Sequence, residues 1–394
     1  MRTKPAILAF FALATIAMQG LLTSCAGDEN LSTEKPSTGT QTLKINLKSA
    51  DTRAAAYADP GTTAENTINR VTIGIFDQTT GDVKTIQDAP NAAAPEIITS
   101  QLVADDDILV AVNAPAGTFT GVLTKSAFEK STLGIDDALP VSGTGTVDPA
   151  KLPMFGDGKI ALKSGSSTIY EATVPVYHMV AKVTLKSLGV DFDATGAYKD
   201  ATFTPTEVFM YNVPDKLDFY PASSSTSYVY NYLTTKTPTY YNGEAGDASV
   251  KAYLGTGTPL GFSPTHATIS GVSGSSAYNW GTVNTKILYL YTMPNNSTKP
   301  TQLVIKGTFD SNGDGTADPG FVYYPVNINY NSANGSAAEG ATPKQVYPNK
   351  NYIVDVTIKG KGASSPSASL DPQTATATVT VQSFVDASQT NVFN

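Results

Sequence analysis

The chain is poor in several residue types that carry chemistry in other proteins. Its 394 residues include one Cys and two His, which excludes internal disulfides and argues against a His-rich metal site. Only 15% of the residues are charged, and the formal net charge is −8. Because an acidic surface repels phosphate backbones, we expect no nucleic-acid partner. Beyond the N-terminal leader, no apolar run is long enough to span a bilayer.

The residues that are abundant favour strands and turns. The chain has 32 Gly, 24 Pro and 20 Tyr, together with many Ser and Thr. This composition predicts an all-β protein, and the length allows two domains. The best candidate for a helix is the short segment over residues 126–133.

The N-terminal segment has the pattern of a lipoprotein signal peptide. A basic start precedes an apolar run over residues 6–18, which is too short for a membrane helix. The run leads to Leu22-Thr-Ser-Cys25, which resembles the bacterial lipobox, and Cys25 is the single cysteine of the chain. We predict that residues 1–24 are removed and that Cys25 carries palmitate-type acyl chains, which anchor the precursor in the outer membrane. The alternative is an ordinary signal peptide with an incidental cysteine.

A strand followed by an arginine comes soon after this leader. Leu43, Ile45 and Leu47 alternate with polar residues, a period of two that predicts a strand with one buried face. Arg53-Ala54 then opens a small-residue segment that a protease can reach. One cut after Arg53 would release the chain from its anchor and remove a core strand. The groove that remains would accept a strand from another chain.

The remaining chain contains many short strand patterns. They cover residues 68–76, 108–113, 159–163, 173–177, 179–186, 207–213, 286–292, 302–308, 320–327, 352–358 and 374–382. The last of these follows a flexible linker rich in Gly and Ser. We expect two β-sandwiches in tandem, over residues 54–177 and 178–362, after a propeptide of residues 25–53. Residues 363–394 form the linker and the terminal strand.

The signals for catalysis or metal binding are weak. Asp310, Asn312, Asp314 and Asp318 resemble a calcium loop, but Phe321 stands where such a loop has Glu, so a polar turn is favoured. Phosphate loops and nucleophile elbows are missing. We expect neither enzyme activity nor a cofactor.

The order of the motifs resembles that of one family. The set begins with the lipobox and the strand that ends in Thr52-Arg53, and it closes with a Gly/Ser/Pro linker and the segment 379–384. Between them come the segments 68–76, 108–113, 180–185 and 351–358. With this order the chain resembles a FimA-type fimbrillin, the type V pilin of Bacteroidales.

The resemblance implies a fold and a route of maturation. It implies two transthyretin-like β-sandwich domains, export as a lipoprotein, and cleavage after Arg53 by an arginine-specific cysteine protease. Assembly into a cell-surface fimbrium then proceeds by strand exchange. The donor residues are Ala377, Val379, Val381 and Phe384, and Phe384 stands where the family often has Trp.

The expected function is that of a structural pilin subunit that supports adhesion. Its expected partners are other copies of itself, related pilins, the protease, and host or bacterial glycans and proteins. One alternative is an uncleaved fimbrial anchor. Another is a surface lipoprotein whose Tyr-rich region over residues 221–291, with Trp280, binds glycans by ring stacking. A tip adhesin is a further alternative, although tip subunits usually lack a donor strand.

Overall fold

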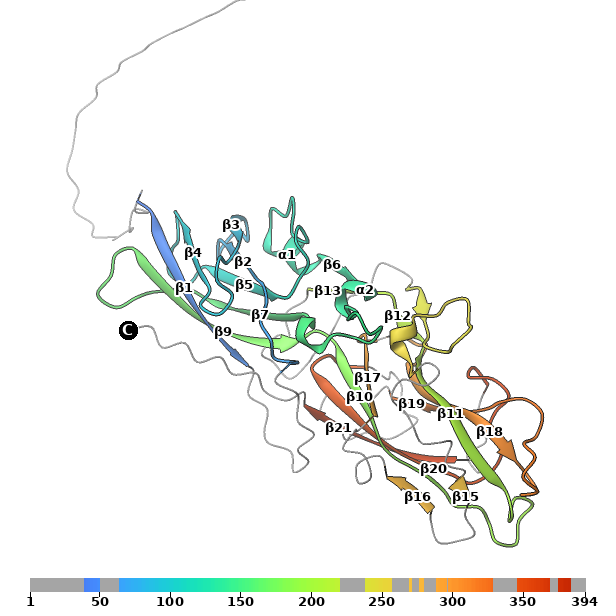
Figure 1. Cartoon of the computed structure of the whole chain (residues 1–394). Coiled ribbons are helices and arrows are strands. Elements are labelled where there is room, and N and C mark those ends of the chain that lie inside the picture. The colour runs from blue at the N-terminus through green and yellow to red at the C-terminus, as the bar shows by residue number, and fades with distance from the viewer. Residues whose placement is uncertain are drawn as a thin grey trace, which may run out of the picture. The chain divides into compact units, whose positions relative to one another are not determined.

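The computed structural model describes most of the chain after residue 38. The described residues are 39–49, 64–219, 238–256, 269–270, 276–279, 288–295, 297–328, 346–368 and 375–383. Among them, no helix is long and apolar enough to cross a membrane. Strands dominate the described chain, which confirms the predicted all-β fold class (Figure 1).

The first sheet has eight strands and lies within residues 41–178. In spatial order seven of them run β3-β2-β5-β7-β9-β1-β4, and β8 also pairs with β9. The bounds are β1 Gln41–Ser49, β2 Val71–Phe76, β3 Val83–Asp88, β4 Glu96–Thr99, β5 Asp107–Val112, β7 Met154–Lys159, β8 Ala161–Leu162 and β9 Ile169–His178. The Gln87 side chain on β3 donates to the Ile98 carbonyl on β4 over 3.2 Å, so the two edge strands come close and the sheet curls.

The curled sheet encloses the first apolar cluster. β5 shows why its sequence is a continuous apolar run, because both of its faces are covered. Ile108, Val110 and Val112 point into the cluster enclosed by the sheet. Leu109 and Ala111, on the other face, belong to a second cluster that also holds Phe119 and Phe128. A strand with two buried faces has no polar alternation to show.

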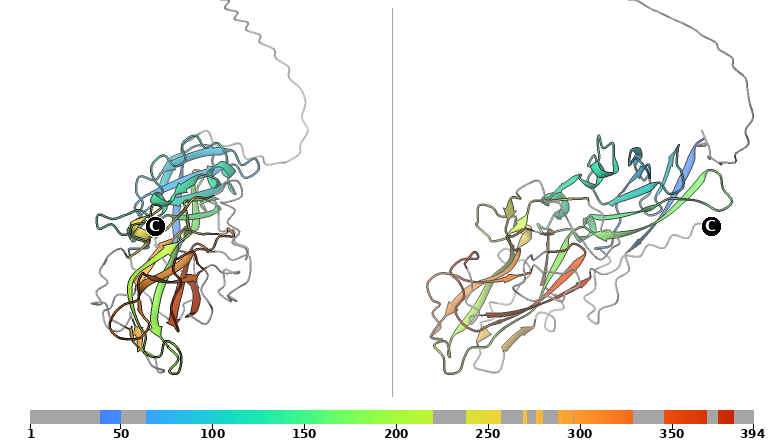
Figure 2. Two further views of the ribbon diagram at one scale, coloured as in Figure 1. Left: turned by 90° about the vertical axis from the view of Figure 1, so that its right-hand side faces the viewer. Right: turned by 180° about the vertical axis from the view of Figure 1, so that it is seen from behind.

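Two larger sheets lie within residues 181–383. One joins β16, β10, β20 and β21, with β17 also on β10, and the other has the order β15-β11-β18-β19. Their bounds are β10 Ala181–Val190, β11 Thr202–Tyr211, β15 Ile269–Ser270, β16 Ser276–Asn279, β17 Leu288–Thr292, β18 Gln302–Asp310, β19 Val322–Asn327, β20 Lys350–Ile358 and β21 Ala375–Ser383. Side chains from both sheets share the second apolar cluster. A short connection joins β9, the last strand of the first sheet along the chain, to β10, the first strand of the later sheets (Figure 2).

Short elements link the first sheet to the later ones. β6 (Thr132–Gly134) pairs antiparallel with β13 (Lys216–Asp218). Beside this ladder, Phe119 stacks on Phe128 with ring centroids 3.7 Å apart, and Phe219 meets Phe119 edge-on at 4.9 Å. The other short elements are α1 Lys125–Glu129, α2 Ile135–Ala138, β12 Val213–Pro214, β14 Tyr240–Tyr241 and 3₁₀ turns at Pro149–Lys151 and Ala252–Leu254.

The predicted helix over residues 126–133 is shorter than expected. α1 covers only Lys125–Glu129, capped by the Thr124 side chain, which accepts from the Ala127 N–H. Leu133 lies instead in β6, where it pairs with Leu217. The pairing with a distant strand overrides the local helical preference, because a five-residue helix contributes little on its own. The domain limits stay a prediction.

Candidate functional site

β1 is the strand around which the candidate site is built. It lies inside the first sheet, parallel to β9 on one side and antiparallel to β4 on the other (Figure 1). The limiting pairs are Thr42–Ile169 and Ser49–Val176 with β9, and Gln41–Thr99 and Lys44–Glu96 with β4. We call the place that β1 occupies between β9 and β4 the slot. Without β1, the sheet would have two unpaired edges there, and β4 would lose its ladder partner.

The apolar residues of β1 belong to the core of the first sheet. Leu43, Ile45 and Leu47 are 0, 0 and 2% exposed and lie in the cluster that the sheet encloses. Lys44 lies on the other face, with its Nζ 3.9 Å from a Glu96 carboxylate oxygen. The alternation seen in the sequence therefore corresponds to a fully buried face and a half-buried face.

The slot also has a polar end, which the sequence reading missed. Gln41 is 1% exposed, and its carboxamide bonds both backbone groups of Leu102. The Leu102 N–H donates to Gln41 Oε1 over 2.7 Å, and Gln41 Nε2 donates to the Leu102 carbonyl over 3.2 Å. The Tyr170 hydroxyl donates to the same carbonyl over 2.9 Å. No local pattern announces this contact, because its two residues are far apart in sequence.

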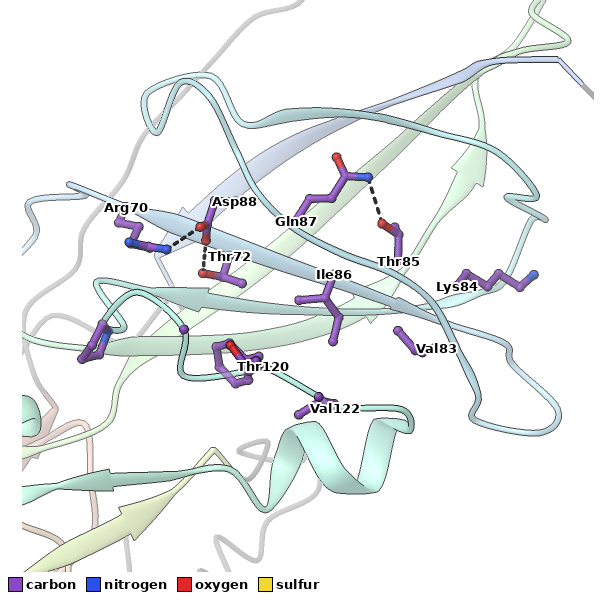
Figure 3. A pocket seen from close by; sticks show the side chains of 14 residues that line it. Arg70, Thr72, Val83, Lys84, Thr85, Ile86, Gln87, Asp88, Thr120 and Val122 are labelled. Atoms are coloured by element: carbon purple, nitrogen blue, oxygen red, sulfur yellow. Dashed lines mark hydrogen bonds and ion pairs between the residues drawn. The ribbon is translucent and has the colours of Figure 1, made fainter. Parts of the chain in front are cut away.

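The lipidation and cleavage residues lie outside the part of the chain that the structure describes. These are Cys25, Arg53 and Ala54. Arg70, the next arginine along the chain, lies in the described part, and its side chain and backbone both have partners. It forms an ion pair with Asp88, which also accepts from the Thr72 hydroxyl over 2.6 Å (Figure 3). The backbone carbonyl of Arg70 accepts a hydrogen bond from the Asn113 N–H over 2.9 Å.

The surroundings of Arg70 disfavour its binding by a protease. It lines a pocket of about 460 Å³ between β3 and the segment 115–122 (Figure 3). A protease needs the peptide extended and free in its cleft, whereas this backbone is bonded and followed at once by β2. A cut after Arg70 would require local unfolding of the sheet.

The predicted donor strand lies on its own chain in the structure. β21 pairs antiparallel with β20, from Ile358–Ala375 to Lys350–Ser383. Ala377 and Val379 are partly buried against the second apolar cluster. The side chain of Val381 and all of Phe384 lie outside what the structure describes. Within the described chain, β21 has one ladder partner, so it is an edge strand.

The residues of the calcium-like loop are occupied by contacts within the protein. The two Asp310 carboxylate oxygens accept from the backbone N–H groups of residues 313 and 315 over 2.8 and 2.9 Å. Asp318 pairs with Lys361 over 2.6 Å, and Asp314 accepts from the Asn312 amide over 2.9 Å. Among the described residues, no group of three or more His, Cys, Asp or Glu is arranged to hold a metal. The geometry is that of a polar turn.

Two described tyrosines of the Tyr-rich region, Tyr253 and Tyr291, are poorly placed for glycan stacking. Tyr253 and Tyr291 line a pocket of about 220 Å³, but they are only 8 and 3% exposed. The Tyr253 hydroxyl donates to Asp136 over 2.7 Å. Ring stacking on a sugar needs an exposed ring face, which these two side chains lack. Trp280 lies outside the described residues.

A buried polar cluster holds the segment that follows the predicted cut. Glu65 pairs with Lys182 of β10 over 3.2 Å and accepts from the Tyr291 hydroxyl of β17. His178 Nε2 lies 2.9 Å from the Glu65 carbonyl oxygen, and burial lowers the pKa of His178. Because Glu65 lies after Arg53 in sequence, this attachment would survive maturation.

We expect Glu65→Ala to lower the free energy of unfolding by about 3–5 kcal/mol, because it removes the carboxylate from the buried Lys182 ammonium. Urea denaturation of the full chain measures this. The matched control is Glu96→Ala, whose carboxylate faces Lys44 near the surface at 3.9 Å and which should change stability by about 1 kcal/mol or less. Equal effects of the two substitutions would contradict a stabilising role for the cluster.

We expect Ile45→Ala to destabilise the uncleaved chain by about 2–5 kcal/mol, because it leaves a cavity in the enclosed cluster. Lys44→Ala, on the half-buried face of the same strand, should have an effect within about 1 kcal/mol. Urea unfolding of both variants gives the comparison. Similar midpoints would show that β1 does not contribute to the core in solution.

Comparison with known proteins shows that the chain is similar to fimbrial subunits. Residues 41–170 match the family model of the major fimbrial subunit protein (FimA). A fimbrilin from Porphyromonas gingivalis shares the fold, with a TM-score of 0.55, 16% identity, and coverage of 87% of this chain and 97% of that one. A protein from Bacteroides eggerthii, provisionally assigned to cell adhesion, has a TM-score of 0.57, 22% identity, and coverage of 87% and 96%. No curated protein matches the chain.

These comparisons relate the fold and one segment of the chain to known proteins. At such identities the solved structures establish the fold, while the matching family model carries the sequence relationship. The family is one of fimbrial subunits and not of enzymes, in agreement with the expectation from the sequence. Residues 41–170, which include the slot strand, are thus similar to the FimA-type fimbrial subunits, the family that the order of the motifs predicted.

Proposed function

We propose that the chain is a structural pilin that matures by cleavage after Arg53 and polymerises head to tail by strand exchange. The family places such subunits in a cell-surface fimbrium with other pilin copies. The observation that carries the proposal is the position of β1. β1 is a core strand that pairs with β9 on one side and with β4 on the other. Its C-terminal end lies just before Arg53 in the sequence.

The precursor is self-complemented and therefore monomeric. As long as β1 fills the slot, the apolar cluster is closed and β4 and β9 have their partners. A cut after Arg53 turns β1 into a separate peptide, held only by non-covalent contacts. Its loss opens an apolar groove flanked by two strand edges, which is a ready acceptor for an extended segment.

The terminal strand of another copy is the segment that fills the slot. Among the described strands of its own chain β21 pairs with β20 alone, whereas in the slot it would have β9 and β4. Each donor side chain that becomes fully buried contributes roughly 1.5–3 kcal/mol before the costs of association. Because the donor and acceptor surfaces differ, the contact does not close on itself and produces a filament.

Export and anchoring follow from the leader. The lipobox-like segment 22–25 directs the precursor to the outer membrane, where acyl chains on Cys25 hold it. An arginine-specific protease then acts as a transient partner at Arg53–Ala54, and the lipid leaves with the propeptide. Host or bacterial surface molecules are the partners in adhesion.

An uncleaved anchor subunit is the second candidate. It would keep both β1 and the lipid, and the closed slot in the structure is the state in which such a subunit would remain. The two functions differ in the N-terminus of the protein found on cells.

N-terminal sequencing of the protein recovered from cells tests the proposal. A mature N-terminus at Ala54, in material that runs as SDS-resistant ladders, is the expected result. A lipidated N-terminus at Cys25 in all of the surface material would reject the stalk function in favour of the anchor.

A further inference from the structure

The polar end of the slot sets a requirement that any incoming strand has to meet. Leu102 is 1% exposed, and its N–H has the Gln41 carboxamide as acceptor at 2.7 Å. Gln101, just before it, has a φ of +66°, so the chain turns here in a left-handed conformation that few residues adopt. When β1 leaves, this buried N–H loses its acceptor. A replacing strand that lacks an amide at this place leaves a buried donor unbonded, which is unfavourable.

The terminal strand repeats the sequence pattern of β1, beginning at the residue that corresponds to Gln41. β1 begins Gln41-Thr42, and Leu43, Ile45 and Leu47 follow at every second place. The terminal segment begins Gln373-Thr374, and apolar residues follow in the same rhythm. They are Ala375, Ala377, Val379 and Val381. The two segments therefore share an initial Gln-Thr and a period of two with the same phase.

We propose that the Leu102 backbone amide is a register-reading subsite and that Gln373 of a neighbouring copy fills it. This inference rests on the proposed strand exchange. The terminal strand then enters in the same direction as β1, parallel to β9 and antiparallel to β4. Ala375, Ala377 and Val379 take the places of Leu43, Ile45 and Leu47.

Two other placements would bury more apolar volume or reverse the strand, and both lose the amide. A shift by two residues puts Ala375 beside Leu102. Reversal of the strand with the same apolar face inward puts Ser383 there, whose hydroxyl is shorter than the Gln41 side chain. The carboxamide alone restores both hydrogen bonds, to the N–H and to the carbonyl of Leu102.

The smaller side chains of the terminal strand have a consequence for timing. β1 presents Leu, Ile and Leu to the cluster, where the proposed register presents Ala, Ala and Val. As long as β1 is covalently attached, it fills the slot better than a terminal strand can. Premature exchange is thus disfavoured, and cleavage becomes the step that permits assembly.

Cysteine pairs across the fibre contact read the register directly. The mature chain would have no native cysteine, because Cys25 leaves with the propeptide. Glu96 of β4 lies opposite Lys44 of β1, so Glu96→Cys marks one place beside the slot. In the proposed register Thr376 of the neighbour takes the Lys44 place. Thr378 takes it after a two-residue shift, and Thr380 takes it in the reversed strand.

The experiment combines Glu96→Cys with Thr376→Cys, Thr378→Cys or Thr380→Cys in the full chain, treated with an arginine-specific protease. Directly opposed residues have Cβ atoms about 4.5–5.5 Å apart, and residues displaced by two lie about 7–8 Å away, beyond easy disulfide reach. We expect covalent ladders on non-reducing gels from the Thr376→Cys pair. Ladders from either other pair instead would overturn the register and leave strand exchange standing. No fibres from any pair, with fibres from the unmodified chain under the same conditions, would count against all three placements.

A second substitution keeps the test independent of the cysteines. Gln373→Leu is added to the chain that carries Glu96→Cys and Thr376→Cys. It should lower the yield of the disulfide between these two cysteines roughly 10-fold, relative to the yield of the disulfide in the Thr378→Cys chain. The reason is that the buried Leu102 N–H loses its acceptor. Gln373→Asn should not restore it, being one methylene too short, and Gln382→Leu, on the opposite face by the strand period, should have no effect. An unchanged ratio with Gln373→Leu would reject the subsite. No fibres even from the unmodified chain would reject strand exchange itself.

Discussion

Arg53→Ala is expected to abolish SDS-resistant ladders and to leave a lipidated monomer. The reason is that β1 stays covalently attached. It remains paired with both β4 and β9, and its apolar side chains stay in the enclosed cluster. A terminal strand from another copy would have to displace a strand that is already bonded on both sides. Gel electrophoresis without boiling measures the ladders, and mass spectrometry measures the N-terminus.

Arg70→Ala is the matched control for this substitution. It removes an arginine that is held by Asp88 at the start of β2, and the exposed ion pair is worth about 1 kcal/mol or less. Fibres should form from this variant as from the natural chain. Normal fibres from Arg53→Ala would show that another peptide bond is the maturation site, or that β1 can leave without a cut.

Truncation after Ala368 is expected to prevent self-assembly while the chain still folds. It removes β21 and keeps the bridge in which Ala363 and Tyr323 exchange backbone hydrogen bonds of 2.9 Å. The truncated chain still has a slot to be opened by cleavage, but it has no strand to donate. The described donor side chains Ala377 and Val379 are only partly buried on their own chain, so their loss should lower stability far less than loss of β1.

An experiment that mixes truncated and full-length chains distinguishes the loss of the donor strand from misfolding of the truncated chain. A truncated copy can accept the terminal strand of a full-length copy but cannot pass one on, so it should end a growing fibre. Substoichiometric addition is therefore expected to shorten the ladders in proportion to the amount added. A misfolded chain would leave the ladder lengths unchanged. Ladders formed by the truncated chain alone would refute the donor role of the terminal strand.

The period of two in β1 was enough to predict its buried face, because alternation along a strand depends only on backbone geometry. It predicted correctly that Leu43, Ile45 and Leu47 share a dry environment. Local signals failed where pairing with a distant strand decided the outcome. Leu133 was expected in a helix and lies in β6, because β13 supplies a partner from far along the chain.

The contacts that give the slot its character are also distant in sequence. The bond between Gln41 and Leu102 and the attachment of Glu65 to Lys182 and Tyr291 join segments that no local pattern relates. A sequence shows which residues prefer to be buried, but it does not show which neighbours they will meet. The shared Gln-Thr at positions 41 and 373 was visible in the letters, yet it acquired a meaning only after Leu102 was seen to bind Gln41.

By itself, the amino-acid sequence determined the fold class, the family resemblance and the alternation of the slot strand, because composition and short-range periodicity reflect backbone geometry. The tertiary structure alone decided that β1 lies between β9 and β4, that its end is polar, and that β21 is a half-covered edge strand. Strand neighbours and register depend on contacts between remote segments, and those contacts exist only once the chain has folded.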